Sequence, residues 1–106
     1  MLKELTPKQV QQRLKDGMPL TIIDVREPWE LQICRLESAL HIPMNDIPDA
    51  LERIPREGDV VIMCHSGGRS AQVALWLTMQ GFTNVYNMAG GIHRWSVEVD
   101  STVPRY

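Results

Sequence analysis

The stretch Asp59-Val60-Val61-Ile62-Met63-Cys64, which continues as His65-Ser66-Gly67-Gly68-Arg69-Ser70, decides the architecture of this chain. Its first half is apolar and rich in β-branched residues, as in a strand that is covered on both faces of a sheet. Its second half is a glycine-rich turn, after which we expect a helix from about residue 69 to residue 80. Strand, cysteine, turn and helix therefore succeed one another directly.

Outward from this stretch, short strands and helices alternate along the chain. We expect further strands over residues 20–25, 39–42 and 84–88, and helices over residues 7–16, 28–33, 44–54 and 91–95. Residues 97–106 have no strong period, and we expect them on the surface. Short connections between alternating strands and helices predict one α/β domain over residues 1–106, with a mostly parallel central sheet flanked by helices on both faces.

Some details of these helices can be predicted more closely. Thr6 is placed to cap the first helix, with Pro7 at its first position and Gln9 completing a capping box. In the helix after the glycine-rich turn, the predicted apolar face consists of Ala71, Ala74, Leu75 and Thr78. Trp29, Trp76 and Trp95 are interpreted mainly as packing residues.

Composition excludes several classes of function. Of the 106 residues, 43% are hydrophobic and 23% charged, which is ordinary for a globular domain with one core. A net charge of -2 gives no broad basic surface for nucleic acid or an anionic membrane. The first residues lack the apolar stretch of a secretion signal, and no apolar run is long enough to cross a bilayer. Two cysteines are too few for a disulfide framework, so we expect a cytoplasmic protein, with a regulatory Cys34–Cys64 bridge left open.

Cys64 is the candidate for chemistry because a glycine-rich turn and a helix come directly after it. Amides at the start of a helix lack partners and carry partial positive charge, and Gly67 and Gly68 allow such amides to converge on an anion. His65 and Arg69 can add positive charge. Thiolates are favoured in such surroundings, so we expect Cys64 to be a nucleophile. The alternative interpretation, a buried structural cysteine, is common for isolated cysteines but does not explain the two adjacent glycines.

The loop from Cys64 to Ser70 resembles the active-site loop of the single-domain rhodaneses, a family of sulfurtransferases. Other parts of the chain are similar to that family in the same order, namely Asp24-Val25-Arg26-Glu27-Pro28, Gly81-Phe82 with Val85, Ala89-Gly90-Gly91 with Trp95, and Val103-Pro104-Arg105-Tyr106. The chain departs from the family at Cys34-Arg35, where a Gly-His pair is usual. This departure affects a turn and leaves Cys34 as a second thiol, which we interpret as uninvolved.

The resemblance implies that Cys64 is the catalytic residue and carries sulfur as a persulfide. A small anionic donor such as thiosulfate would deliver the sulfur, and the acceptor would be cyanide, a thiol or a sulfur-relay protein. The residues expected to bind the donor are His65, Ser66, Gly67, Gly68, Arg69, Ser70 and Arg26. No cofactor is implied, and the cysteines and histidines lack the spacing of a zinc site, so we predict no metal.

The roles of other residues near Cys64 can be predicted from their places in the expected strands, helices and turns. Ser66 and Ser70 are expected to brace the loop or cap the helix rather than attack a substrate. Asp24 and Arg26 end a predicted strand, and we expect Asp24 in a structural ion pair and Arg26 at the mouth of the site. His93 is expected on the surface, in a turn that can lie beside Cys64.

Two other functions remain open on the sequence alone. Cysteine phosphatases and arsenate reductases also place a cysteine at a strand end, but their loops typically have five residues between cysteine and arginine. Here four residues separate Cys64 from Arg69, and the smaller loop suits a single sulfur atom better than a tetrahedral oxyanion. A non-catalytic partner-binding module of similar fold is the second alternative, although such modules often lack the cysteine.

Overall fold

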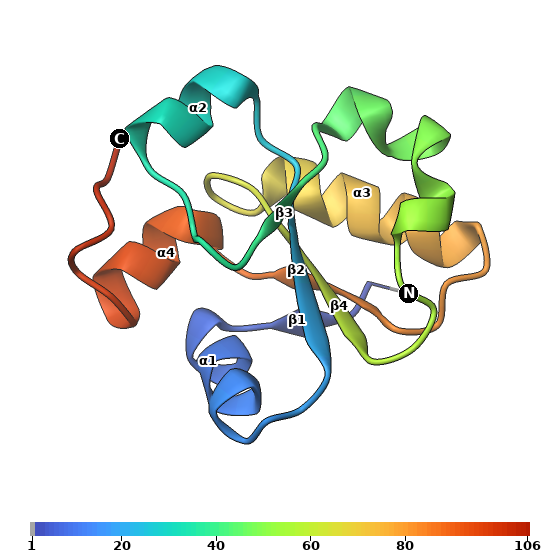
Figure 1. Ribbon diagram of the computed structural model, residues 1–106, viewed down its shortest axis with the longest axis horizontal. Coiled ribbons are helices and arrows are strands. Elements are labelled where there is room, and N and C mark those ends of the chain that lie inside the picture. Colours follow the sequence, from blue (N-terminus) through green and yellow to red (C-terminus); the bar gives the residue numbers. More distant parts are fainter. Residues whose placement is uncertain (1) are drawn as a thin grey trace.

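The computed structural model describes residues 2–106 and contains a five-stranded sheet in which every neighbouring pair of strands is parallel (Figure 1). The strands are β1 (Glu4–Leu5), β2 (Leu20–Asp24), β3 (Leu40–His41), β4 (Asp59–Met63) and β5 (Val85–Met88), in the order β1-β5-β4-β2-β3. The predicted fold class is confirmed. The short strand β1 was not predicted, because two residues are too few to show the alternation of side chains that indicates a strand. It pairs Glu4 with Asn87 of β5.

Helices cover both faces of the sheet (Figure 1). They are α1 (Pro7–Lys15), α2 (Pro28–Ile33), α3 (Gly68–Met79) and α4 (Gly91–Glu98), together with the 3-10 helices η1 (Met44–Asp49) and η2 (Leu51–Arg53). Helices α1 and α4 pack against each other on one face, and α3 packs beside η1 on the other. None of the helices within residues 2–106 is long and apolar enough to cross a membrane.

Strand β4 is the centre of the core, as its composition predicted. Val60 and Ile62 belong to the cluster beneath α3, whereas Val61 and Met63 belong to the cluster beneath α1 and α4. All four side chains are fully buried. Because side chains of a strand alternate between the two faces, one apolar run supplies both cores. The carboxyl end of β4 is thereby fixed, and Cys64 comes directly after it.

The first helix begins as the sequence predicted. The Gln9 amide donates to Thr6 Oγ1 at 3.2 Å, and the Thr6 amide donates to Gln9 Oε1 at 2.8 Å, so both halves of the capping box are present. Pro7 occupies the first turn, where no amide hydrogen is needed. The helix ends at Lys15, and Gly17 adopts a positive φ of 71° just beyond it.

Two helical predictions need correction. Residues 44–54 form 3-10 turns rather than one α-helix, because Pro48 within η1 cannot donate the hydrogen bond that an α-helix requires. The buried face of α3 consists of Ser70, Val73, Ala74 and Leu77, one residue out of phase with the prediction. Apolar residues lie nearly all around this helix, so the sequence did not fix which face turns inward.

Trp29 and the tail also depart from expectation. Trp29 is 61% exposed on α2 and is not a core residue, whereas Trp95 is buried in the core beneath α4. The chain after α4 does not simply lie on the surface, since Val103 is buried and Tyr106 contacts Arg26 and Glu30. Figure 1 shows the tail ending beside α2.

The central position of β4 makes its side chains costly to truncate. Replacing Ile62, which is fully buried, with alanine should lower the free energy of unfolding by about 2–5 kcal/mol. Urea denaturation measures this change. The matched control is Val97→Ala on α4, where the side chain is 54% exposed and the change should stay within about 0.5 kcal/mol. Equal losses in the two variants would contradict the placement of Ile62 in the core.

Candidate active site

The turn after Cys64 depends on a glycine at position 67. Gly67 caps α3 with a φ of 107°, a left-handed conformation that other residues rarely adopt. A Cβ atom at this position would also come within 3.2 Å of the Gly90 amide nitrogen. The loop can therefore fold tightly against the start of α4 only with glycine here.

Three hydrogen-bond donors converge on the Cys64 sulfur. The Gly67 amide lies 3.1 Å from Sγ, the Ser70 amide 3.4 Å and the Ser70 hydroxyl 3.3 Å. The two amides belong to the first turn of α3 and its cap, where intrahelical partners are lacking. Cys64 is only 1% exposed. The arrangement supports a negatively charged sulfur, and it agrees with the expected convergence of amides on an anion.

Ser70 is held in turn by Asn87, a residue that was not among the predicted site residues. Asn87 of β5 is buried, and its Oδ1 lies 2.5 Å from the Ser70 hydroxyl. The Asn87 side-chain amide donates to Glu4 Oε2 at 2.8 Å and to the Gly67 carbonyl at 3.3 Å. The single Ser70 proton can be directed either to Asn87 or to the Cys64 sulfur. Ser70 thus braces the loop, as expected. Asn87 could have been suspected from the sequence, because it is a polar residue within the otherwise apolar strand β5.

The start of α4 is built onto the same loop. The Ile92 amide donates to the Cys64 carbonyl at 2.9 Å, and the His93 amide donates to the His65 carbonyl at 3.0 Å. These bonds satisfy the loop carbonyls and hold the turn at Gly90-Gly91 beside Cys64, as the sequence suggested. His93 itself is exposed, and its ring contacts His65 edge to face at 6.1 Å between centroids.

Glu30 of α2 organises the charges around the loop. Its carboxylate accepts two hydrogen bonds from Arg69, at 2.7 and 2.8 Å, and one each from the Glu27 amide and the Tyr106 hydroxyl, both at 2.8 Å. The Arg69 hydrogen bonds lower the pKa of Glu30 to about 2, although burial opposes them. The same pair raises the pKa of Arg69, with a smaller contribution from Cys64. From the sequence, Glu30 was expected only to favour the first turn of its helix, and its role as a partner of Arg69 was missed.

Arg26 does not line the mouth of the site, contrary to our expectation. Its side chain is fully buried, donates to both Asp24 carboxylate oxygens and reaches the Cys34 carbonyl at 2.8 Å. Burial lowers the pKa of Arg26, but hydrogen bonds to Asp24 and Tyr106 outweigh it, so that the pKa is raised. A buried guanidinium needs such partners, and these partners hold it beneath the site. The expected structural ion pair of Asp24 is confirmed.

The loop residue His65 packs against the tail. Its ring stacks on the Tyr106 ring with 4.0 Å between centroids and an interplanar angle of 11°. The Tyr106 ring also meets Trp29 edge to face at 6.4 Å. The structure therefore brings His65 and Arg69 together with Glu30 and Tyr106 around the loop. No pattern in the sequence placed Tyr106 here.

The other predicted residues lie around the loop and at the end of α2. Ser66 and Gly68 are exposed on the loop. Cys34 is a buried free thiol at the end of α2, and His41 Nε2 is 2.7 Å from the Arg26 carbonyl. Within residues 2–106, no group of three or more His, Cys, Asp or Glu side chains is placed to hold a metal ion.

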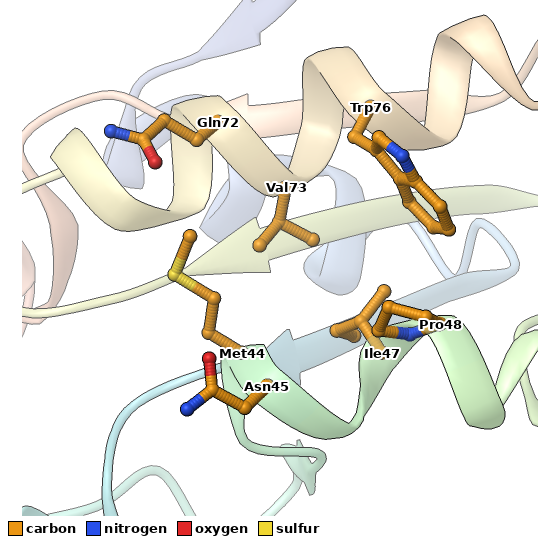
Figure 2. A pocket seen from close by; sticks show the side chains of 7 residues that line it. All are labelled: Met44, Asn45, Ile47, Pro48, Gln72, Val73 and Trp76. Atoms are coloured by element: carbon orange, nitrogen blue, oxygen red, sulfur yellow. The ribbon is translucent and has the colours of Figure 1, made fainter.

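An apolar groove lies between η1 and α3 (Figure 2). Its volume is about 420 Å³, and it is lined by Met44, Asn45, Ile47, Pro48, Gln72, Val73 and Trp76. Cys64 is absent from this lining, and none of the lining side chains titrates. The groove therefore offers packing surface, whereas the groups capable of chemistry lie at the loop.

Known proteins of one family are similar to this chain in sequence and in fold. The sequence model of a family described as "Rhodanese-like domain" matches residues 6–98. A sulfurtransferase of Allochromatium vinosum is 38% identical over 96 residues, which cover 91% of this chain and 90% of that protein. Rhodanese-like/PpiC domain-containing protein 12, a chloroplastic protein of Arabidopsis thaliana, is 36% identical over 112 residues; the match covers 99% of this chain but 38% of that protein. The crystal structure of a rhodanese-like domain protein from Staphylococcus aureus superposes with a TM-score of 0.84 at 30% identity, covering 99% of each chain.

The close approach at Gly91 gives a test of how the loop is supported. Gly91 has a φ of 63°, and a Cβ atom there would lie 2.5 Å from the Cys64 carbonyl oxygen and 2.4 Å from that of His65. Gly17 has a similar φ of 71° but nothing within 4 Å of that position. Gly17→Ala should lower the free energy of unfolding by about 1 kcal/mol from backbone strain, and Gly91→Ala by about 1–3 kcal/mol more from the clash. Thermal denaturation compares them, and equal losses would contradict the proposed close packing.

The Glu30–Arg69 pair predicts a pH dependence of stability. Because the folded-state pKa of Glu30 is about 2, below its ordinary 4.5, its stabilisation is complete above pH 4.5 and disappears as the pH falls toward 2. In that window, the free energy of unfolding of wild type should fall more steeply than that of Glu30→Gln. Urea denaturation at several pH values measures the slopes. Glu37→Gln is the control, because the Glu37 side chain is 84% exposed and its removal should leave the slope unchanged.

Proposed function

Because the chain belongs to the rhodanese-like family, whose sequence model matches residues 6–98, we propose that it is a sulfurtransferase that carries sulfur as a persulfide on Cys64. The observation that carries the proposal is the convergence of the Gly67 amide, the Ser70 amide and the Ser70 hydroxyl on the Cys64 sulfur. Fixed donors of this kind stabilise a sulfur anion without needing to reorganise during the reaction.

The reaction would proceed in two displacements through a covalent intermediate. In the first, the Cys64 thiolate attacks the outer sulfur of thiosulfate; the bond from that sulfur to the sulfonate breaks, and sulfite leaves with the bonding electrons. In the second, a nucleophile such as cyanide attacks the terminal sulfur of the persulfide and leaves as thiocyanate, which restores the thiolate. Charge is conserved in each step and no general base is needed, so the kinetics should be ping-pong.

The shape of the site favours a slender anionic donor. Because Cys64 is only 1% exposed, we expect a donor whose transferable sulfur projects from a slender end. Arg69 supplies positive charge in the loop, and its pKa is raised mainly by the hydrogen bonds to Glu30, with a smaller contribution from Cys64. His65 and the exposed residues Ser66 and Gly68 border the approach. In this proposal Arg26 acts from beneath the site and does not touch the donor.

The acceptor in the cell is proposed to be a thiol, either small or carried by a sulfur-relay protein. A thiol that attacks the terminal sulfur would become a persulfide itself, with the thiol proton released to solvent. Both cysteines of this chain are free, which suits a reducing cytoplasm. Cyanide then serves as a convenient acceptor in the assay.

The arrangement of Arg69 weakens the phosphatase alternative. In a phosphate-binding loop an arginine guanidinium faces the tetrahedral oxyanion, whereas here both terminal nitrogens of Arg69 bind Glu30. Four residues between Cys64 and Arg69 also form a small loop. We therefore expect no measurable hydrolysis of aryl phosphates.

Intact-protein mass spectrometry tests the proposed intermediate. Reduced protein treated with thiosulfate should gain the mass of one sulfur atom, and cyanide should remove it. Cys64→Ser should gain nothing, because it lacks the nucleophile. Cys34→Ser is the matched control, a second buried thiol at the end of α2, and it should gain sulfur as wild type does.

Two outcomes would count against the proposal. Wild-type protein that is folded and reduced but gains no sulfur from thiosulfate or from glutathione persulfide would exclude the persulfide carrier and favour a partner-binding module. Sulfur gained by Cys64→Ser but not by Cys34→Ser would move the chemistry to the other cysteine.

A further inference from the structure

We propose that Tyr106 is a positioning residue of this site: its hydroxyl holds the Glu30–Arg69 pair beside Cys64, and its ring fixes His65. The inference deepens the proposed sulfur transfer and rests on it for the catalytic consequence only. The contacts themselves involve a tail residue, two buried charges and the residue next to the nucleophile in the chain.

The direction of the hydrogen bonds at the Tyr106 hydroxyl is determined by its partners. Arg26 Nη1 lies 3.0 Å from the phenol oxygen, and Glu30 Oε1 lies 2.8 Å from it. A guanidinium can only donate, so the phenol oxygen accepts from Arg26 and its own proton goes to Glu30. Burial raises the pKa of Tyr106 to about 12, so this proton is retained at neutral pH.

This hydroxyl joins two ion pairs that are otherwise separate. One is Asp24–Arg26, which is fully buried, and the other is Glu30–Arg69, which reaches the loop. The Arg69 side chain is 36% exposed, so its position near Cys64 depends on Glu30 rather than on burial. Without the hydroxyl, Glu30 loses one of its donors, and Arg26 Nη1 keeps only a distant contact with the Cys34 sulfur at 3.8 Å.

The Tyr106 ring makes a second, independent contribution. Its stacking on His65 is a close aromatic contact, with 4.0 Å between centroids. His65 directly follows Cys64 in the chain, so the stacking restrains the residue next to the nucleophile. If the tail served only for packing, the hydroxyl would be dispensable, since buried Val103 already anchors the tail to the core.

Two substitutions separate these contributions. Tyr106→Phe removes the hydroxyl and keeps the ring, whereas Tyr106→Ala removes both. Tyr86→Phe is the matched control, because it deletes the same atom from a partly buried tyrosine on β5 that faces Lys3 and Arg13. Far-ultraviolet circular dichroism and urea denaturation confirm that each variant is folded before it is compared.

The first measurement does not require enzyme activity. The rates of Cys64 alkylation by iodoacetate and by iodoacetamide are measured for each variant in the Cys34→Ser background, and their ratio reports the local charge felt by an anion. Tyr106→Phe should lower the ratio about two- to fivefold, the size of one partly screened charge interaction. Carbon NMR of the Glu30 carboxylate should show its pKa rising from about 2, because a hydrogen bond to the charged form is lost. Tyr86→Phe should change neither quantity.

The second measurement concerns the ring. Stacking on Tyr106 should displace the His65 ring-proton resonances, and Tyr106→Phe should keep that displacement while Tyr106→Ala loses it. In the sulfur-transfer assay, Tyr106→Phe should raise the thiosulfate KM with little change in kcat. A single variant, Tyr106→Phe, decides the role of the hydroxyl if Tyr106→Ala does not fold.

The outcomes distinguish failure of this inference from failure of the proposed function. An unchanged or increased alkylation ratio together with an unchanged Glu30 titration in Tyr106→Phe would overturn the positioning role of the hydroxyl, whatever the activity. His65 resonances that are the same in Tyr106→Ala and wild type would overturn the role of the ring. Wild type that carries no sulfur, with the alkylation ratio lowered in Tyr106→Phe, would overturn the proposed function and leave the positioning role supported.

Discussion

The buried guanidinium of Arg26 is the constraint on which the arrangement of this site depends. An arginine that has no exposed surface must find an opposite charge and hydrogen-bond acceptors inside the protein, because an unpaired charge there is strongly destabilising. Asp24 at the end of β2 supplies the charge, the carbonyl at the end of α2 supplies an acceptor, and the tail supplies the Tyr106 hydroxyl. One side chain thereby joins a strand, a helix and the tail.

The consequence for the site is transmitted through α2. Once Cys34 at the end of this helix is bound by Arg26, Glu30, one turn earlier, is placed where it meets Arg69 of α3. The position of Arg69 relative to the loop is therefore set by contacts outside the loop and α3. In this way the local electrostatics at Cys64 depend on residues that are distant from it in the chain.

The parts that could be predicted from sequence are those encoded locally. A strand, a cysteine, two glycines and a helix start lie within about twelve residues, so the convergence of amides on Cys64 results from local geometry. The α/β class could be inferred from the alternation of elements. The phase of α3 could not, because its apolar residues surround the helix and the buried face is selected by contacts with the rest of the fold, among them those of Ser70 with Cys64 and Asn87. Glu30 and Tyr106 are 76 positions apart in the chain, and no sequence pattern predicts a contact over such a separation.

The charges at this site also determine what stabilises a sulfur anion. Asp24, Arg26, Glu30 and Arg69 contribute two negative and two positive charges, which cancel as a group. Arg69 lies in the same loop as Cys64, and Glu30 binds both of its terminal nitrogens. The amides of Gly67 and Ser70 add dipoles at closer range. A site built from fixed dipoles can hold a thiolate and a persulfide equally well, because neither form requires a counter-ion to enter or leave. In the proposed reaction, Cys64 alternates between these two states in each turnover.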